Sequence, residues 1–156
     1  MVTARTGTPH RDLGTDMRLL VTGSEGFIGR HVVEAARAAG HDIEGWDLAR
    51  GLDVAEMALG NSSLYDAIIN CAGVAGVSRS FEEPGSYWHE NTYAAALLFS
   101  HARRQRSVPV VHASSALAAY PEHSPYAASK YAAELAALFE NAQGGDIRIV
   151  RIHNVY

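Results

Sequence analysis

The sequence contains only one cysteine, Cys71, in 156 residues. A single cysteine cannot close an internal disulfide, which excludes a disulfide-stapled secreted scaffold and favours the reducing cytoplasm as the compartment. No apolar run reaches the roughly 20 residues that a membrane-spanning helix needs. The formal net charge is only −4, so electrostatics gives no reason to expect a nucleic acid or a membrane as a partner.

Metal-binding patterns are also missing. The eight histidines are scattered, and neither a His-Glu-x-x-His pattern nor a cluster of cysteine with histidine occurs, so we expect no metal site. Residues 1–16 are rich in threonine, glycine and charged residues and are expected to form a disordered tail. Residues 17–156 contain no interdomain linker and are expected to form one domain.

What the chain does contain is an alternation of apolar strand-like runs with helical patterns. Such alternation predicts parallel βαβ units and a doubly wound α/β domain, the Rossmann fold, with about six strands. The expected strands cover residues 18–22, 43–47, a brief stretch within 48–53, 67–71, 108–113 and 147–152. The expected helices cover residues 27–39, 87–106 and 125–141.

A glycine-rich turn, TGSEGFIG over residues 22–29, joins the first strand to the first helix. A dinucleotide pyrophosphate needs bare backbone close by and free N–H donors at a helix N-terminus, and Gly23, Gly26 and Gly29 suit that need. Asp47 ends the second strand, where a carboxylate can bind the adenosine ribose hydroxyls and repel a 2′-phosphate. NAD is therefore favoured over NADP, although Arg50 nearby could accommodate that phosphate.

A catalytic set follows from three further residues. Tyr126 and Lys130 are four apart on a predicted helix and share a face. A tyrosine with an ordinary pKa near 10 is a poor base at neutral pH, but a nearby lysine ammonium stabilises the phenolate. Ser115 lies at the carboxyl end of the fifth strand and could orient a substrate alcohol, with Ser114 as the other candidate. Cys71 is interpreted as a packing residue rather than a nucleophile.

Together these motifs resemble the extended short-chain dehydrogenases/reductases, in particular the NAD-dependent nucleotide-sugar epimerases and dehydratases. The resemblance implies that NAD is bound by the turn residues Gly23, Gly26, Phe27, Ile28 and Gly29, by Asp47, by the adenine-contacting pair Asp53 and Val54, by the post-strand residues Cys71, Ala72 and Gly73, and by Asn91, Tyr126 and Lys130. It also implies substrate contacts from Ser78, Arg79 and Asn154, with a UDP- or dTDP-sugar as the substrate.

In such enzymes the tyrosine deprotonates the sugar 4-hydroxyl while C4 gives a hydride to NAD, which leaves a 4-keto intermediate. The family's dehydratases carry an acidic pair beside the strand-end hydroxyl residue, whereas this chain has Ala116-Leu117-Ala118, which favours an epimerase-type outcome. The resemblance also implies a homodimer through the helices near 87–106 and 125–141, whose apolar faces exceed what one sheet can cover.

Two departures keep alternatives open. The family's substrate region mostly follows the position of Tyr156, so we expect this chain to stop before that domain. The connection from Tyr120 to Tyr126 is also short, which is closer to single-domain oxidoreductases acting on a small alcohol or carbonyl. A third alternative is a non-catalytic NAD-binding protein.

Overall fold

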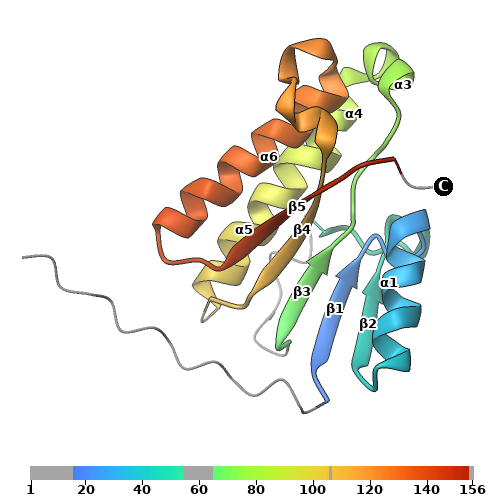
Figure 1. The fold of residues 1–156 in the computed structure, drawn as a ribbon, viewed down its shortest axis with the longest axis vertical. Coiled ribbons are helices and arrows are strands. Elements are labelled where there is room, and N and C mark those ends of the chain that lie inside the picture. Colours follow the sequence, from blue (N-terminus) through green and yellow to red (C-terminus); the bar gives the residue numbers. More distant parts are fainter. Residues whose placement is uncertain (1–15, 55–64, 106, 155–156) are drawn as a thin grey trace, which may run out of the picture.

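One parallel sheet organises the molecule. The computed structural model describes residues 16–54, 65–105 and 107–154, so the expected disordered tail lies almost entirely outside the described residues. The sheet has five parallel strands in the order β2-β1-β3-β4-β5 (Figure 1). Their bounds are β1 (Arg18–Thr22), β2 (Asp42–Trp46), β3 (Ala67–Asn70), β4 (Val110–Ser115) and β5 (Ile147–Ile152). The predicted doubly wound α/β fold is confirmed.

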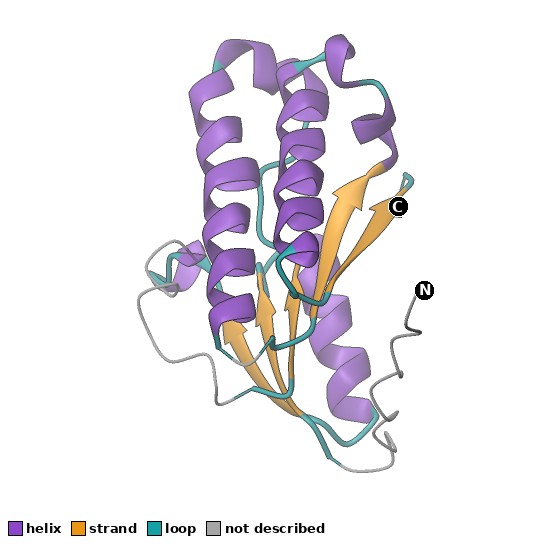
Figure 2. Cartoon of the chain, turned by 90° about the vertical axis from the view of Figure 1, so that its left-hand side faces the viewer, coloured by secondary structure: helices purple, strands orange, loops and turns teal. Residues whose placement is uncertain are grey.

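Helices cover both faces of the sheet. One face carries α1 (Phe27–Ala38), and the other carries α5 (Ala94–Arg104) and α6 (Pro125–Ala142), as Figure 2 shows. The start of α6 is fixed by two neighbouring residues: Pro125 occupies the first turn, and the Ser124 Oγ accepts a hydrogen bond from the Ala127 N–H at 3.1 Å. None of the helices in the described part is long and apolar enough to cross a bilayer.

The brief strand expected within residues 48–53 is wrong. Leu48–Arg50 forms a 3-10 helix instead. The Asp47 carboxylate accepts a hydrogen bond from the Ala49 N–H at 2.9 Å, and Gly51 ends the turn with a left-handed φ of 73°. The side-chain cap from Asp47 and the glycine that ends the turn favour this 3-10 helix over an extended strand.

The helix expected over residues 87–106 is also more complex than a single helix. The structure places α3 (Val77–Glu82) and α4 (Pro84–Tyr87) before it, then a π-helical segment, Trp88–Tyr93, which leads into α5. A π-helical segment widens the turn and re-aims side chains, and such segments concentrate at functional sites. Here it contains Asn91, one of the predicted site residues.

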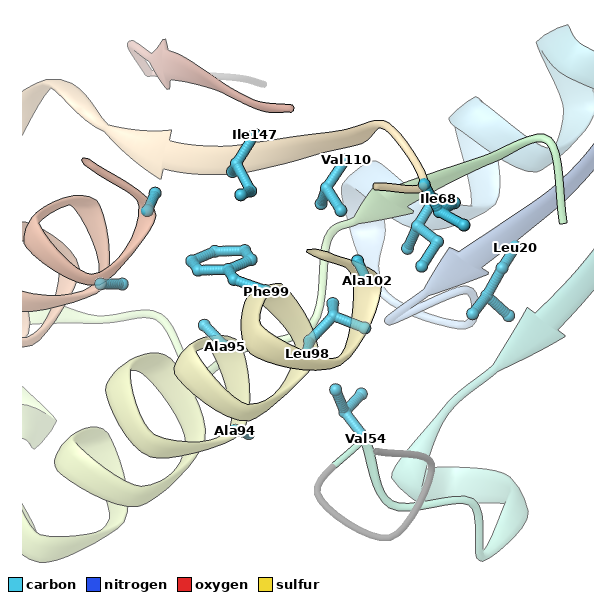
Figure 3. Close-up of a cluster of buried hydrophobic side chains, with 13 residues drawn as sticks. Leu20, Val54, Ile68, Ala94, Ala95, Leu98, Phe99, Ala102, Val110 and Ile147 are labelled. Atoms are coloured by element: carbon cyan, nitrogen blue, oxygen red, sulfur yellow. The ribbon is translucent and has the colours of Figure 1, made fainter. Parts of the chain in front are cut away.

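The core lies between the sheet and the α5–α6 layer. Figure 3 shows Phe99 and Leu98 of α5 facing inward-pointing side chains of the strands, including Ile68 and Val110. Val54, which precedes β3, also packs into this cluster at 6% exposure. Because α5 and α6 rest on this apolar layer, the carboxyl ends of β3 and β4 meet the start of α6.

The strand order creates a topological switch point. From β1 the chain passes to β2 on one side and later to β3 on the other, so the connections that leave β1 and β3 diverge. In open α/β sheets, ligands bind in the crevice at the carboxyl ends of the strands flanking such a point. The residues there are those of the glycine turn after β1 and of the turn that follows Asn70.

Candidate active site

The glycine turn brings two backbone segments into contact at the switch point. Gly23 adopts a φ of 67°, and a Cβ atom at this position would lie 2.7 Å from the backbone of both Cys71 and Ala72. A Cβ on Gly29 would lie 2.0 Å from the Gly23 carbonyl oxygen, so only glycine lets α1 begin this close to the turn. At Gly23 and Gly29 a side chain would therefore clash with neighbouring backbone, so the turn and the start of α1 require glycine there.

The start of α1 is free for an anionic ligand. The Gly26 N-cap offers no side chain to the first turn, and no acidic residue lies within that turn. The first N–H groups of the helix, those of Phe27, Ile28 and Gly29, point out of an uncapped N-terminus where the helix dipole is positive. This donor set fits a pyrophosphate.

Asp47 fixes the other wall of this region. One carboxylate oxygen accepts the Glu25 N–H at 2.9 Å, and the other accepts the Ala49 N–H at 2.9 Å. Each oxygen keeps lone pairs that can still accept from ribose hydroxyls. Arg50 is exposed and donates to the Gly45 carbonyl at 3.3 Å while lying 3.9 Å from the Glu25 carboxylate.

Lys130 is a buried cation with few partners. Its side chain lies at the sheet-facing side of α6, the residue is 7% exposed, and its Nζ donates to the Ala113 carbonyl at 3.2 Å. Burial lowers the pKa of Lys130 from 10.5 to about 8. An ammonium carries three donors, and only one of them has a partner among the described residues. A buried lysine that no carboxylate of residues 16–54, 65–105 or 107–154 pairs with is the feature that most clearly marks this region as a candidate site.

Tyr126 lies one helical turn before Lys130 on α6. Its ring packs edge-on against Tyr87 at 6.2 Å between centroids, and its hydroxyl has no hydrogen-bond partner within the described ranges. The Tyr87 hydroxyl in turn donates to the carbonyls of Ala75 and Gly76 at 2.8 and 2.9 Å. The Tyr126 ring is thus held by packing while its hydroxyl stays available.

The two strand-end serines differ in their hydrogen bonds. The Ser114 hydroxyl donates to the buried Glu134 carboxylate at 2.6 Å. The Ser115 Oγ accepts the Leu117 N–H at 3.2 Å, which leaves its own hydrogen free to be donated. Ser114 is therefore engaged in the structure, and Ser115 has the free donor that an incoming oxygen needs.

Asn91 holds the loop that follows β3. Its Oδ1 accepts the Val74 N–H at 2.9 Å, and its Nδ2 donates to the Val74 carbonyl and the Ser129 Oγ at 3.1 and 3.0 Å. The neighbouring Thr92 hydroxyl donates to the Ser129 carbonyl at 2.8 Å. The π-helical segment thereby joins the loop after Cys71 to the turn of α6 that bears Lys130.

Cys71 itself is half-buried beside the site. Burial raises the pKa of the Cys71 thiol to about 11, opposed by the charge of Lys130. The thiol therefore stays protonated at neutral pH and is a poor nucleophile, which agrees with the interpretation of Cys71 as a packing residue.

The sequence interpretation missed a buried polar ladder. Thr22, Asn70 and His112 are register neighbours on β1, β3 and β4. The Thr22 hydroxyl donates to the Asn70 Oδ1 at 2.6 Å, and the Asn70 Nδ2 donates to the His112 Nδ1 at 3.0 Å. Burial, together with the charge of Lys130, lowers the pKa of His112 to about 3, so the imidazole is neutral. Only strand register, which the sequence does not reveal, could have identified this ladder.

The remaining predicted residues lie apart from the buried set. Ser78 and Arg79 are exposed on α3, where Arg79 pairs with Glu83 at 3.0 Å. Asn154 is exposed just after β5. The Val54 side chain belongs to the core, so only its backbone could contact adenine. Asp53 keeps its polar contacts within the chain.

These features together fit a nicotinamide dinucleotide. An uncapped helix start and a glycine turn suit the pyrophosphate, the Asp47 carboxylate suits the adenosine ribose, and the under-partnered Lys130 suits the nicotinamide ribose. The described residues include no group of three or more His, Cys, Asp and Glu side chains that could hold a metal ion.

Solved structures confirm the fold. MoeE5, in complex with UDP-glucose and NAD, is 26% identical with a TM-score of 0.70, covering 85% of this chain and 52% of MoeE5. TunA, an NAD-dependent NDP-hexosamine 5,6-dehydratase, is 27% identical with a TM-score of 0.79, covering 90% of this chain and 56% of TunA. UDP-glucose 4-epimerase from Brucella ovis, in complex with NAD, is 23% identical with a TM-score of 0.76, covering 88% and 52%.

This chain spans about half the length of those proteins. No curated protein sequence matches it significantly. The model of the NAD-dependent epimerase/dehydratase family, however, matches residues 19–156, which include the whole sheet except the first residue of β1. On that match, the chain belongs to the NAD-dependent epimerase/dehydratase family, and the cofactor of this family is NAD.

Proposed function

We propose that this chain is the NAD-binding and catalytic part of an oxidoreductase that acts at C4 of a nucleotide sugar through a 4-keto intermediate. The observation that carries the proposal is Lys130, buried beside the switch point, four residues after a tyrosine whose hydroxyl is free. NAD, when bound, accepts a hydride from the substrate carbon. The family and the nucleotide-sugar ligands of its structural relatives support the substrate class.

Tyr126 is the proposed base. Tyr126 lies one turn of α6 before Lys130, and its hydroxyl, which has no hydrogen-bond partner among the described residues, is the group proposed to accept the proton of the sugar 4-hydroxyl. Lys130 stays in place because its Nζ is tied to the Ala113 carbonyl at 3.2 Å. Proton removal by Tyr126 accompanies loss of the hydride from C4, which balances the oxidation of the alcohol to a ketone.

Ser115 is the proposed partner of the reacting oxygen. Its free O–H can donate to the C4 oxygen, whereas the Ser114 hydroxyl already donates to Glu134 at 2.6 Å. This difference supports the assignment of the catalytic serine to Ser115. The segment Ala116-Leu117-Ala118 continues as a 3-10 helix without any acid, so an epimerase-type outcome is proposed over dehydration.

The substrate side is proposed from the exposed residues at the carboxyl edge of the sheet. Ser78, Arg79 and Asn154 could bind the nucleotide and sugar of a UDP- or dTDP-linked substrate, because all three are exposed. We also propose a homodimer through α5 and α6. Exposed apolar side chains lie on α6 and at the end of the π-helical segment that leads into α5: Tyr131, Leu135, Leu138 and Phe139 on α6, and Tyr93 just before α5.

A substrate screen tests the proposal. The purified protein with NAD is offered a panel of UDP- and dTDP-sugars and, in parallel, simple secondary alcohols. The transient absorbance of NADH at 340 nm is followed by stopped flow with protein in excess, because an epimerase-type reaction returns the hydride to the sugar. The proposal expects transfer from sugar nucleotides only, and its loss in Tyr126→Phe. Reduction by simple alcohols alone would favour the single-domain oxidoreductase instead. NAD binding without any Tyr126-dependent transfer would favour a non-catalytic NAD-binding protein.

A further inference from the structure

Glu134 is a buried carboxylate on the catalytic face of α6. The residue is 5% exposed and follows Lys130 by four positions, so Tyr126, Lys130 and Glu134 share one side of the helix. The proposed chemistry gives this carboxylate no part in proton or hydride transfer. A buried acid without a chemical role needs a structural reason for its burial.

The carboxylate is fully paired. Its Oε1 accepts the Ser114 hydroxyl at 2.6 Å and the Arg151 Nε at 3.0 Å, while its Oε2 accepts the Arg151 Nη2 at 2.7 Å. Burial would raise the pKa of Glu134, but the hydrogen bonds from Arg151 and Ser114 hold it below its ordinary value. The two hydrogen bonds from the planar Arg151 guanidinium also fix the orientation of the Glu134 carboxylate, which a single hydrogen bond does not.

These three residues come from three different elements, and each stands next to a proposed functional residue. Ser114 precedes Ser115 on β4, and Arg151 lies three residues before Asn154 on β5. Glu134 lies one turn after Lys130 on α6. The cluster therefore joins the helix that carries the base to the two strand ends that carry the other site residues.

We propose that Glu134 is a positioning residue that, with Ser114 and Arg151, sets the distance between the Tyr126–Lys130 face of α6 and Ser115. The inference rests on the proposed function. Proton and hydride transfer depend steeply on such a distance, since a misplacement of about 1 Å can slow an enzyme by about 100-fold. The opposite side of the same turn is held separately, by the bonds from Asn91 and Thr92 to Ser129.

The same helix offers a matched control. Glu140 is also buried on α6, at 7% exposure, and its carboxylate pairs with Arg103 of α5. It lies at the end of α6 away from Tyr126 and touches neither β4 nor β5 through any side-chain bond found in the described ranges. Glu134→Gln and Glu140→Gln therefore remove similar buried charges, one at each end of the helix.

The test compares these two variants in the intact protein with NAD and UDP-glucose. For Glu134→Gln we expect kcat to fall about 30- to 100-fold while KM and the NAD dissociation constant stay within about threefold. For Glu140→Gln we expect all three to stay within about threefold, although both variants lose thermal stability. Arg151→Lys keeps the charge but not the two-point geometry, so its kcat should lie between those of the wild type and Glu134→Gln.

Amide hydrogen exchange gives a readout that needs no substrate. In Glu134→Gln, the exchange rate over residues 114–117 and 126–130 should rise about tenfold relative to Glu140→Gln. The reason is that α6 loses its carboxylate contacts with Ser114 of β4 and Arg151 of β5. Equal kcat and equal exchange in the two variants would overturn the positioning role. If the wild type transfers no hydride from any sugar nucleotide, the proposed function fails, and the exchange comparison alone then decides the role of Glu134.

Discussion

The two halves of the candidate site consist of different chemical groups, backbone in one and buried polar side chains in the other. The β1–α1–β2 half consists mainly of backbone groups, in the Gly23 turn and an uncapped helix start, together with one carboxylate, that of Asp47. The β4–α6 half depends on buried polar side chains, among them Lys130, Glu134 and His112. The first half is shaped by the absence of side chains, and the second by side chains whose burial has to be offset by specific partners.

This contrast separates binding from chemistry. Backbone donors and a glycine turn recognise a pyrophosphate without taking part in a reaction. A buried lysine with a lowered pKa costs folding free energy and is retained where it serves a proton transfer. Changes in the first half should therefore weaken NAD binding, and changes in the second should slow the reaction or alter stability.

The largest effect is expected for Lys130→Met. Hydride transfer should fall by about 1,000-fold or more, because the proposed catalytic set loses the lysine one turn after its base. The variant without NAD should nevertheless unfold with a free energy roughly 1–3 kcal/mol higher at pH 7, since burial lowers the pKa of Lys130 from 10.5 to about 8. Urea denaturation and absorbance at 340 nm measure the two quantities.

The pH dependence of wild-type stability tests whether the buried Lys130 destabilises the folded state. A depressed lysine pKa means that the folded state binds its proton more weakly than the unfolded state. The free energy of unfolding should therefore contain a component that is fully present above pH 10.5 and is lost as the pH falls through 8. If the free energy of unfolding of Lys130→Met changes with pH as steeply as that of the wild type between pH 10.5 and 8, the change does not come from Lys130.

Gly23→Ala tests the backbone half, with Gly51→Ala as its control. Both glycines have left-handed φ values, 67° and 73°, but a Cβ on Gly51 meets nothing within 4 Å, whereas one on Gly23 meets the backbone of Cys71 and Ala72. We expect Gly51→Ala to cost about 1 kcal/mol of stability and Gly23→Ala about 2–4 kcal/mol. NAD affinity should fall about 30-fold only in Gly23→Ala. Equal losses of stability in the two variants would show that the left-handed backbone conformation, rather than the nearby Cys71 and Ala72 backbone, explains the glycine at position 23.

Asp47→Ala should weaken NAD binding about tenfold, because the ribose loses an acceptor and the Glu25 and Ala49 N–H groups lose theirs. Asp47→Asn keeps an acceptor for one of these N–H groups and should show a smaller loss. Titration calorimetry measures the dissociation constants of NAD and NADP for each variant. The ratio of the two constants should move closer to one than in the wild type. An unchanged preference would remove Asp47 from cofactor selection.

The smallest effect is expected for His112→Asn. Burial, and then the charge of Lys130, lowers the pKa of His112 from 6.5 to about 3, so the folded state excludes a proton that the unfolded state accepts. Wild-type stability should fall as the pH drops below 6.5, by up to about 1.4 kcal/mol per pH unit from this group. His112→Asn keeps an acceptor for Asn70 but has no titrating ring, so its slope between pH 6.5 and 5 should be shallower. If the stability of the wild type and of His112→Asn fell equally with pH, the His112 imidazole would not be buried in its neutral form.

The glycine turn of the backbone half could be located from the sequence for a physical reason. Its features are local, because the glycine turn and Asp47 lie within 30 residues of one another and carry their own conformational signals. Where the prediction was wrong, at residues 48–53, a local signal was overlooked, since an Asp followed by a Gly four residues later is a turn pattern. The boundaries of β1 and β5 and the start of α6 were also set by nearby residues.

The side-chain half was harder to predict. In the sequence, Glu134 stands among alanines and would be interpreted as a solvated helix residue. Its burial depends on Ser114, 20 positions earlier, and Arg151, 17 positions later. The neutral His112 likewise depends on register with Asn70. Such pairings arise from the tertiary fold, so the catalytic residues could be proposed from spacing but their supports could not.

Isotope transfer is the most direct test of the central claim, that Tyr126 and NAD together oxidise C4 of a nucleotide sugar. UDP-glucose carrying deuterium at C4 is mixed with excess protein and NAD, the reaction is quenched in alkali during the first turnover, before the hydride returns to the sugar, and the reduced nicotinamide is analysed by mass spectrometry. The account predicts deuterium on the nicotinamide in the wild type and none in Tyr126→Phe, which should still bind NAD. Label that stays at C4 while NAD is reduced, or transfer that survives in Tyr126→Phe, would contradict it.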